Sequence, residues 1–444
     1  MTSVSSAPET KLSLSKSLRV DARFDGVLLT LMVIALSIQG PALFFLDSMD
    51  FTLGHLMVGL MGAAALLRCL LSGRRLVMPP AAVNVLFVVF ALVTVIDTAR
   101  FGFGSMIFKY AFQYLVLFVA LNLMNLMDSG NALLAVKRGA VAVFALVLLN
   151  ACVHVDAFFE YYSNPWDGHP EYETLISGGL NLEATWPAML GVFMPNNRRG
   201  WIYLIASVVF SALVQSRAGL VLAGLALAYV LLIKDGGRPS LQCVLVVAIT
   251  AVAACAITVA GPRAAVHAAY LESMQEQEAS IQELPSSADS NADASLSADA
   301  NAGPAQAGGL IGTPGRKGIW AASLQVLREN FLFGHGAGNA MDAVRALSGY
   351  PYRENNVHNY PLQVLIDFGF VGFAAFAVVV VRYLISNFKA RFRSPFAAFI
   401  ALYLIGGLIQ FAGGELLVGF AMAGLIVFGP YAGRPNLREV NLDE

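Results

Sequence analysis

The sequence predicts an all-α, polytopic membrane protein with about twelve transmembrane helices and one large, partly helical loop outside the membrane. Two observations lead to this prediction. Hydrophobic residues make up 57% of the chain and charged residues only 13%, and apolar runs near the ~20 residues needed to cross a bilayer recur along its length. Backbone polar groups inside a bilayer must be paired within the protein, so runs of this length are expected to be helices.

The order of these runs predicts the domain organisation. We expect an N-terminal tail over residues 1–23, transmembrane helices 1–9 over residues 24–260, the large loop over residues 261–360, transmembrane helices 10–12 over residues 361–430 and a C-terminal tail over residues 431–444. The helices are expected to be centred near Val33, Leu60, Phe87, Leu117, Phe144, Ala188, Val208, Leu225, Ala248, Ala375, Leu402 and Gly424. No small-residue cleavage site follows the first run, so we interpret it as an anchor and not as a removed signal peptide.

Basic residues predict the orientation of the chain. If the N-terminus is cytoplasmic, most Lys and Arg residues fall in inside loops, whereas the short outside loops hold little beyond Arg100 and Arg217. Both tails are then cytoplasmic, and the large loop lies outside. The four cysteines fall in or beside predicted helices, so no disulfide framework is expected in that loop. The net charge of −1 says little about partners, and no nucleic-acid partner is expected.

The large loop has three parts. Residues 263–284 have the pattern of a polar helix. Residues 286–309 are rich in Ala, Ser and Asp and lack aromatic residues, so this insert is predicted to be disordered. Residues 316–333 regain helical periodicity, and the residues expected on their apolar face are Ile319, Trp320, Leu324, Leu327 and Phe331.

Charged residues cluster near the predicted outer edge of the membrane. They lie at the outer ends or in the outer halves of helices and comprise Lys109, Glu183, Arg217, Asp367 and Glu415. Such residues are costly in a bilayer unless they are paired or face a wet cavity. Their shared location suggests a polar cavity that opens outward. For Asp367 and Glu415 taken singly, a structural ion pair is the favoured interpretation.

Arg217 and Arg316 are the sharpest candidates for an anion-binding site. Each opens a predicted helix at the outer face, and Trp320 follows Arg316 one turn later. A guanidinium group is permanently charged and makes forked contacts with phosphate oxygens. The alternative is that both arginines only extend into the lipid headgroup region.

His358 lies where the large loop re-enters an apolar run. Pro361 marks the first turn of the following helix, and the positive end of that helix favours a neutral imidazole, which can accept a proton. The alternative is a structural histidine that caps the helix beside Asn359. No two histidines have HExxH spacing and no Asp-x-Asp triplet occurs, so no metal or other cofactor is expected.

A glycine-rich stretch precedes this site at residues 334–339, with the sequence Gly-His-Gly-Ala-Gly-Asn. It is similar to loops that cradle phosphate groups, but no apolar strand precedes it in a βαβ context. We therefore interpret it as a turn between two surface helices.

Together these features resemble a known family. The long outside loop, Ser-Arg-Ala-Gly at residues 216–219, Arg316 with Trp320, the glycine-rich stretch, and His-Asn-Tyr-Pro-Leu-Gln at residues 358–363 followed by Gly369 and Gly372 resemble the O-antigen ligase and polymerase superfamily of bacterial envelopes. The resemblance implies a GT-C-type membrane glycosyltransferase in the bacterial inner membrane, with its active site facing the periplasm. It implies undecaprenyl-diphosphate-linked glycan as the donor and makes Arg217, Arg316 and His358 the functional positions. The insert and His335 depart from the family pattern and leave the acceptor contacts open.

Transfer chemistry is consistent with these residues. Two arginines could stabilise the departing diphosphate without a metal, and His358 could take the acceptor proton as general base, with inversion at the anomeric carbon. Asn359, Lys109, Glu183 and Trp320 are candidate supporting residues. Within the family we expect an O-antigen ligase whose acceptor is lipid A-core. A polymerase or a protein O-oligosaccharyltransferase is the alternative. A transporter, which predicts internal repeats and broken helices in matching halves, is less favoured because the sequence indicates neither.

Overall fold

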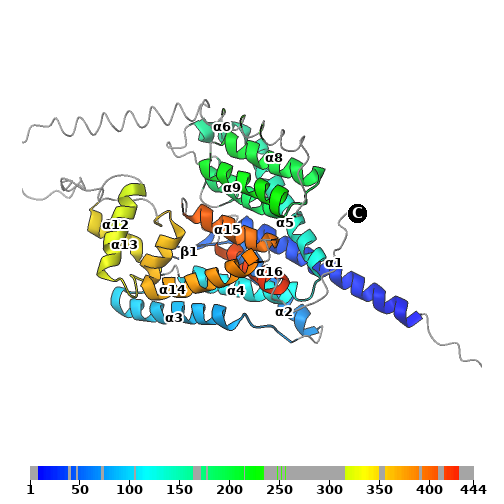
Figure 1. The fold of residues 1–444 in the computed structure, drawn as a ribbon, viewed down its shortest axis with the longest axis horizontal. Helices are drawn as coiled ribbons and strands as arrows, with labels where there is room; N and C mark the ends of the chain where they lie inside the picture. The colour runs from blue at the N-terminus through cyan, green and yellow to red at the C-terminus, as the bar shows by residue number, and fades with distance from the viewer. Residues whose placement is uncertain are drawn as a thin grey trace, which may run out of the picture.

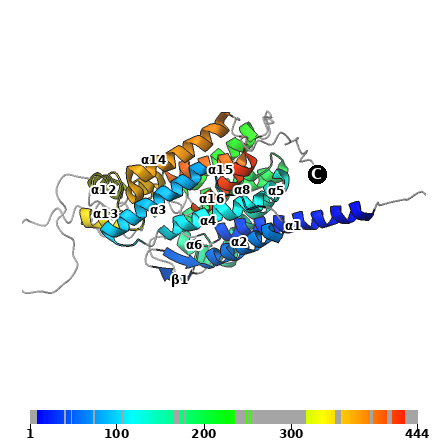
Figure 2. The same cartoon turned by 90° about the horizontal axis from the view of Figure 1, so that it is seen from below.

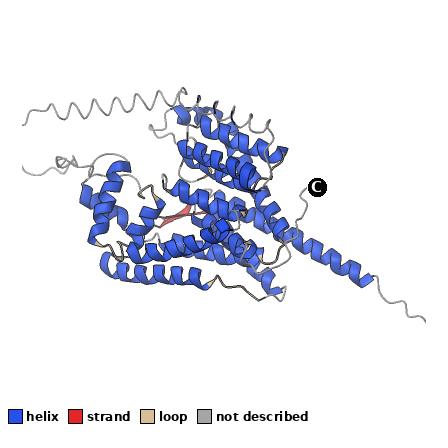
Figure 3. Cartoon of the chain, in the orientation of Figure 1, coloured by secondary structure: helices blue, strands red, loops and turns tan. Residues whose placement is uncertain are grey.

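A computed structural model gives the structure of residues 9–38, 42–46, 49–71, 75–104, 107–163, 172–176, 179–214, 216–234, 248, 252, 256, 316–349, 356–389, 393–408 and 415–429. Within these residues the fold is helical apart from one short hairpin (Figures 1 and 3). The predicted polar helix at 263–284 and the insert at 286–309 lie outside the described residues, as do the side chains of Lys109 and Glu415.

The N-terminal part contains five long helices and the hairpin. These are α1 (Glu9–Ser37), β1 (Ala42–Leu46), β2 (Met49–Thr52), α2 (Leu53–Leu71), α3 (Ala81–Phe101), α4 (Ile107–Met124) and α5 (Ser129–Val153). The antiparallel hairpin, in which Leu46 pairs with Met49, is a small departure from the all-α prediction. Helix α1 begins at Glu9 and therefore extends into the stretch expected to be a tail.

The middle of the chain forms shorter helices around the second half of the bundle. These are α6 (Val155–Ser163), α7 (Leu180–Leu190), η1 (Gly191–Phe193), α8 (Arg198–Leu213), α9 (Arg217–Ala228) and η2 (Tyr229–Lys234). Polar side chains start several of them. The side-chain oxygens of Asn197 and Ser216 accept hydrogen bonds from the backbone N–H groups of Gly200 and Gly219 at 3.1 and 3.0 Å, which satisfies donors that a helix start leaves unpaired.

The C-terminal part comprises α12 (Arg316–Glu329), α13 (Ala340–Ser348), α14 (Tyr360–Lys389), α15 (Pro395–Gly407) and α16 (Glu415–Phe428). Helix α16 packs along α4, α14 along α3, and α15 against α7 and α9. Figures 1 and 2 both show α12 and α13 gathered at one end of the paired helices α3 and α14.

Four described helices are long and apolar enough to cross a membrane, namely Leu53–Leu71, Ala81–Phe101, Ser129–Val153 and Tyr360–Leu384. Shorter apolar helices occur at Tyr110–Met124, Arg217–Ile233, Pro395–Gly407 and Leu417–Phe428. A multi-pass, mostly helical membrane protein is therefore confirmed. The number of twelve spans stays a prediction, and of the helix centred on Ala248 the structure describes only isolated residues.

Helices α12 and α13 form a small unit with its own core. This core contains Ile319, Ala322, Val326, Leu327, Ala340, Met341, Val344, Val357 and Ile366. The helix start at Arg316 agrees with the prediction, but the predicted apolar face is only partly correct. Leu324 and Phe331 are 52% and 49% exposed, whereas Ile319 and Leu327 are buried, because the buried stripe of α12 also includes the small residues Ala322 and Ser323.

Helix α14 is broken at Gly369. Its φ of 61° and ψ of −167° lie outside the helical region, so two helical segments meet at this residue. The sequence did not predict this break. The transporter alternative predicts internal repeats and broken helices in matching positions of the two halves, and a break at Gly369 by itself does not meet that expectation.

The glycine-rich turn between α12 and α13 fits against this break. The backbone N–H groups of His335 and Gly336 donate to the carbonyl oxygens of Ile366 and Asp367 at 2.9 and 3.0 Å. In return, the N–H groups at the start of the second segment, those of Phe370 and Val371, donate to the carbonyl oxygens of Phe331 and Leu332 at 2.8 and 3.1 Å. The turn therefore supplies the hydrogen bonds that the break removes from the helix, as a membrane-embedded chain requires.

Candidate active site

The segment that carries His358 is anchored by Asn359. The side-chain oxygen of Asn359 accepts a hydrogen bond from the backbone N–H of Leu362 at 3.0 Å and so caps the start of α14. The side-chain nitrogen of Asn359 donates to the carbonyl oxygen of Leu408, just after α15, at 3.0 Å. The capping role that the sequence left open for His358 thus belongs to Asn359.

His358 itself has an unusual backbone conformation. With a φ of 54°, it is the one residue other than glycine that has a positive φ among the described residues. This region is strained for residues with a side chain, and such strain persists where surrounding contacts hold the conformation. The backbone N–H of His358 donates to the side-chain oxygen of Asn356 at 3.0 Å, and the residue is half-buried.

The peptide groups of Val357 are held on both sides. Its N–H donates to Oε1 of Gln363 at 3.0 Å, and its carbonyl oxygen accepts a hydrogen bond from the indole N–H of Trp320 at 2.7 Å. The Val357 side chain is buried in the core of the α12–α13 unit. Trp320 therefore contacts Val357, the residue that precedes His358. The sequence predicted only that Trp320 lies on the same helix as Arg316.

Asp367 lies one turn below Gln363 in α14. Its carboxylate accepts hydrogen bonds from Nε2 of Gln363 at 2.9 Å and from the hydroxyl of Tyr110 at 3.4 Å. Asp367 is 0% exposed, so it does not face an outward cavity as the grouping of charges suggested. The sequence did not predict the contacts of Gln363 and Tyr110 with Asp367. The signal available for Gln363 was its i, i+4 spacing to Asp367 within an apolar helix.

Glu183 also lies inside the protein and not in an open cavity, with 0% exposure. It accepts hydrogen bonds from the Tyr172 hydroxyl at 3.1 Å and from the backbone N–H of Leu175. These contacts fasten the segment 172–176 to the first turn of α7. The role visible in the structure is therefore anchoring of this segment.

Arg316 and Arg217 are both exposed and both begin helices. Arg316 lies one turn before Trp320 on α12, a helix that packs against α14. Arg217 starts α9, after the cap formed by Ser216. The structure thus brings the helix of Arg316 into direct contact with the His358 segment through Trp320.

Arg217 is connected to this region through α15. At the end of α15, Gly406 lies so close to Leu222 of α9 that an added Cβ would come within 3.1 Å of its side chain. A Cβ added to the neighbouring Gly407 would lie 2.9 Å from the Cβ of Tyr360 in α14. This end of α15 therefore contacts both α9, which begins at Arg217, and the first turn of α14, which follows His358.

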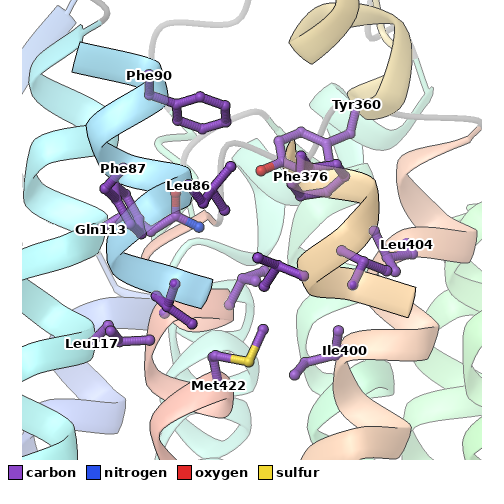
Figure 4. Close-up of a pocket in the computed structure, with 15 residues that line it drawn as sticks. Leu86, Phe87, Phe90, Gln113, Leu117, Tyr360, Phe376, Ile400, Leu404 and Met422 are labelled. Atoms are coloured by element: carbon purple, nitrogen blue, oxygen red, sulfur yellow. The ribbon is translucent and has the colours of Figure 1, made fainter. Parts of the chain in front are cut away.

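An apolar pocket begins beside Tyr360, and its empty space of about 580 Å³ includes open solvent at its mouth. It runs between α3, α4, α14, α15 and α16, and its walls include Phe90, Gln113, Tyr360, Phe376, Leu404 and Met422 (Figure 4). Apart from Gln113 and Tyr360 the lining is hydrocarbon or aromatic. Because Tyr360 is two residues from His358, a molecule with both a polar and a hydrocarbon part could reach His358 and the pocket together.

Comparison with known families adds one finding. A family model described as O-antigen ligase matches residues 185–377. No curated protein matches the chain at a significant level. The matched stretch contains Arg217, the α12–α13 unit, the His358 segment and the break at Gly369, which are the features of the site. Residues 185–377 of this membrane protein therefore match the O-antigen ligase family.

Proposed function

We propose that this protein is an O-antigen ligase. It would transfer completed O-antigen polysaccharide from undecaprenyl diphosphate to the lipid A-core oligosaccharide at the periplasmic face of the bacterial inner membrane. Family membership supports a glycosyltransferase of this kind. The single observation that carries the residue assignment is the strained, fixed backbone at His358, because such strain clusters at functional sites.

In this proposal His358 is the general base. An acceptor hydroxyl attacks the anomeric carbon of the donor sugar, and the imidazole takes the hydroxyl proton as the new C–O bond forms. The bond from the anomeric carbon to the phosphate oxygen breaks, and its electron pair leaves with undecaprenyl diphosphate. A single direct displacement inverts the configuration at that carbon.

Arg316 and Arg217 are assigned to the donor diphosphate. Both guanidinium groups are exposed at helix starts, and the backbone N–H groups of a helix start add partial positive charge. Negative charge grows on the leaving diphosphate in the transition state, where fixed cationic groups stabilise it most. The reaction is therefore proposed to need no metal ion.

The apolar pocket beside Tyr360 is proposed to hold the first isoprene units of the donor lipid. Its position next to the His358 segment and its apolar lining support this assignment. A hydrocarbon chain in this pocket would fix the diphosphate at the membrane surface without polar contacts to the lipid.

Deletion of the gene, followed by gel analysis of lipopolysaccharide, tests the ligase assignment. A ligase predicts core that lacks all polymer, with polymer retained on the lipid carrier. Core that bears a single repeat would instead assign the polymerase, and unchanged lipopolysaccharide with loss of a glycosylated protein would assign the protein O-oligosaccharyltransferase. Complementation with the wild-type gene should restore the polymer on the core. Complementation with His358→Gln shows whether restoration requires the side chain of His358.

A further inference from the structure

Helix α14 buries two polar side chains in an otherwise apolar first segment. Gln363 is 2% exposed and Asp367 is 0% exposed, and they lie one helical turn apart. Burying polar groups in a membrane-spanning segment is costly unless they are hydrogen-bonded. The contacts of this pair therefore indicate what the two residues do.

The hydrogen bonds form a chain that ends next to His358. The Tyr110 hydroxyl and Nε2 of Gln363 donate to the two carboxylate oxygens of Asp367 at 3.4 and 2.9 Å. Oε1 of Gln363 accepts the N–H of Val357 at 3.0 Å. Because the backbone N–H of Val357 can only donate, the amide oxygen of Gln363 faces Val357 and its NH₂ faces Asp367.

Val357 is consequently fixed from two helices. Gln363 of α14 holds its N–H, and Trp320 of α12 holds its carbonyl oxygen at 2.7 Å. The following residue is His358, whose positive φ must be maintained by its surroundings. An anchored peptide immediately before a strained residue determines the direction in which the side chain of that residue leaves the backbone.

From these contacts we propose that Gln363 and Asp367 are positioning residues for His358. Asp367 orients the amide of Gln363, and Gln363 fixes the Val357 peptide. The fixed peptide then sets the direction in which the imidazole of His358 leaves the backbone. The proposal rests on the proposed function, because aiming matters to catalysis only if His358 reacts. A misplacement of about 1 Å in a reacting group can lower the rate by roughly 100-fold.

The test compares Gln363→Met, which keeps length and volume, with Asn122→Leu as control. Asn122 is a buried amide of α4 that holds both the N–H and the carbonyl of Val77, at 2.7 and 3.0 Å. It therefore fixes a backbone segment in the same way, far from His358 in the chain. Gln363→Met should lower kcat by about 10- to 100-fold with KM for the lipid-linked donor within about threefold, whereas Asn122→Leu should keep kcat near the wild-type value.

A double substitution provides a rescue. Gln363→Glu alone places a second acidic group against Asp367 and removes the N–H donor that Asp367 accepts from, so it should lose activity. Asp367→Asn alone keeps an oxygen that accepts from Nε2 of Gln363, so it should lose less. Together they restore every donor–acceptor match, because the introduced carboxylate accepts from Val357 and from the introduced amide, which in turn accepts from Tyr110. Recovery of kcat to within about tenfold of the wild type is expected, and a double variant as slow as the worse single variant contradicts the proposal.

Labelling of His358 with diethyl pyrocarbonate, read by mass spectrometry, gives a measurement that does not depend on transfer. Its rate should change in Gln363→Met and Gln363→Glu and return in the double variant, but stay unchanged in Asn122→Leu. Wild-type labelling rates and wild-type kcat in folded Gln363→Met overturn the positioning role. Absence of glycan transfer by the wild-type protein, with labelling that still depends on Gln363, overturns the proposed function instead.

Discussion

At the level of single residues, the site depends on an unfavourable backbone conformation being held by its neighbours. His358 has a positive φ. The side chains of Trp320 and Gln363 hold the peptide groups of Val357 before it, and the side chain of Asn359 after it bonds to the backbone of Leu408. Asn359 caps α14, so the helix cap does not depend on His358. This division of roles makes the general-base proposal testable by conservative substitution.

His358→Asn and His358→Gln should fold and bind the lipid-linked donor normally, yet transfer glycan at least ~100-fold more slowly. An amide can replace a hydrogen bond but cannot accept a proton near neutral pH. The exposed His154 provides a control, since His154→Gln should behave as the wild type. Near-normal rates in His358→Gln would leave the reaction without this base.

Arg217→Lys and Arg316→Lys keep a positive charge but lose the forked geometry, so each should retain less activity than the exposed control Arg393→Lys. Replacement by Ala should cost on the order of 100-fold or more, as expected for a lost contact to transition-state charge. Initial rates with purified variants measure this, and exhaustive chelation should leave the wild-type rate unchanged. Wild-type rates in the Ala variants would reduce both arginines to membrane anchors.

At the level of elements, the central feature is the joint between the glycine-rich turn and the break in α14. Gly334 has a φ of 81°, and a Cβ there would lie 2.6 Å from the carbonyl oxygen of Ile366. A Cβ on Gly369 would collide with the backbone of Leu332 and Phe333. Each glycine thus permits the close backbone approach through which the turn bonds to the broken helix.

Gly334→Ala and Gly369→Ala should therefore destabilise the protein more than Gly349→Ala. Gly349 also has a positive φ, of 64°, but its Cβ would have open space. Its replacement should cost roughly 1 kcal/mol for backbone conformation alone, whereas the other two should cost about 1–3 kcal/mol beyond that for the displaced backbone. Apparent melting temperatures in detergent measure the order of destabilisation. Equal shifts for all three variants would contradict the close backbone approach at Gly334 and Gly369.

The same turn contains a histidine whose charge state should affect stability. His335 stacks on Phe101 of α3 at 5.2 Å between ring centroids and pairs with Asn330 at 2.9 Å. Burial lowers the pKa of His335; the charge of Arg100 acts in the same direction and that of Glu329 in the opposite one. The neutral form is therefore favoured in the folded protein.

Stability should consequently fall as the pH drops below about 6.5, because the unfolded chain then binds a proton more readily than folded His335 does. The loss should end once the pH is below the lowered pKa of the folded state. His335→Phe keeps the ring contact with Phe101 and should weaken this dependence, while His154→Gln should preserve it. Melting temperatures measured across this range check the prediction, and identical pH profiles for the wild type and His335→Phe would contradict it.

At the level of the whole molecule, charge asymmetry predicts on which side of the membrane the site lies. The outside loop and the inside loops predicted by the basic residues can be distinguished by labelling. In a cysteine-free background, Ser290→Cys should react with a membrane-impermeant thiol reagent in intact spheroplasts. Ser394→Cys, in the loop before α15, should react only after permeabilisation. The reverse pattern would invert the orientation and remove the periplasmic site.

The sequence alone determined the helical membrane architecture and the neighbourhood of the site. The expected helix centres that fall on described helices each lie inside one, because burial in a bilayer depends on local composition and length. Helix α1, however, begins before the expected first span, and α6 and the hairpin were not expected. The helix start at Arg316 and the helix start after Asn359 were likewise predictable from short-range signals. The family resemblance, which rested on short motifs, was confirmed.

Only the tertiary structure decided how the site is held. Tyr110 and Asp367 are 257 residues apart in the chain, and Trp320 is 37 residues from Val357, so neither contact has a local pattern. The glycine-rich stretch was correctly expected to be a turn, but its partner, the break at Gly369, could not be inferred. Both glycines are permissive on their own, and only the approach of two backbones makes each of them necessary.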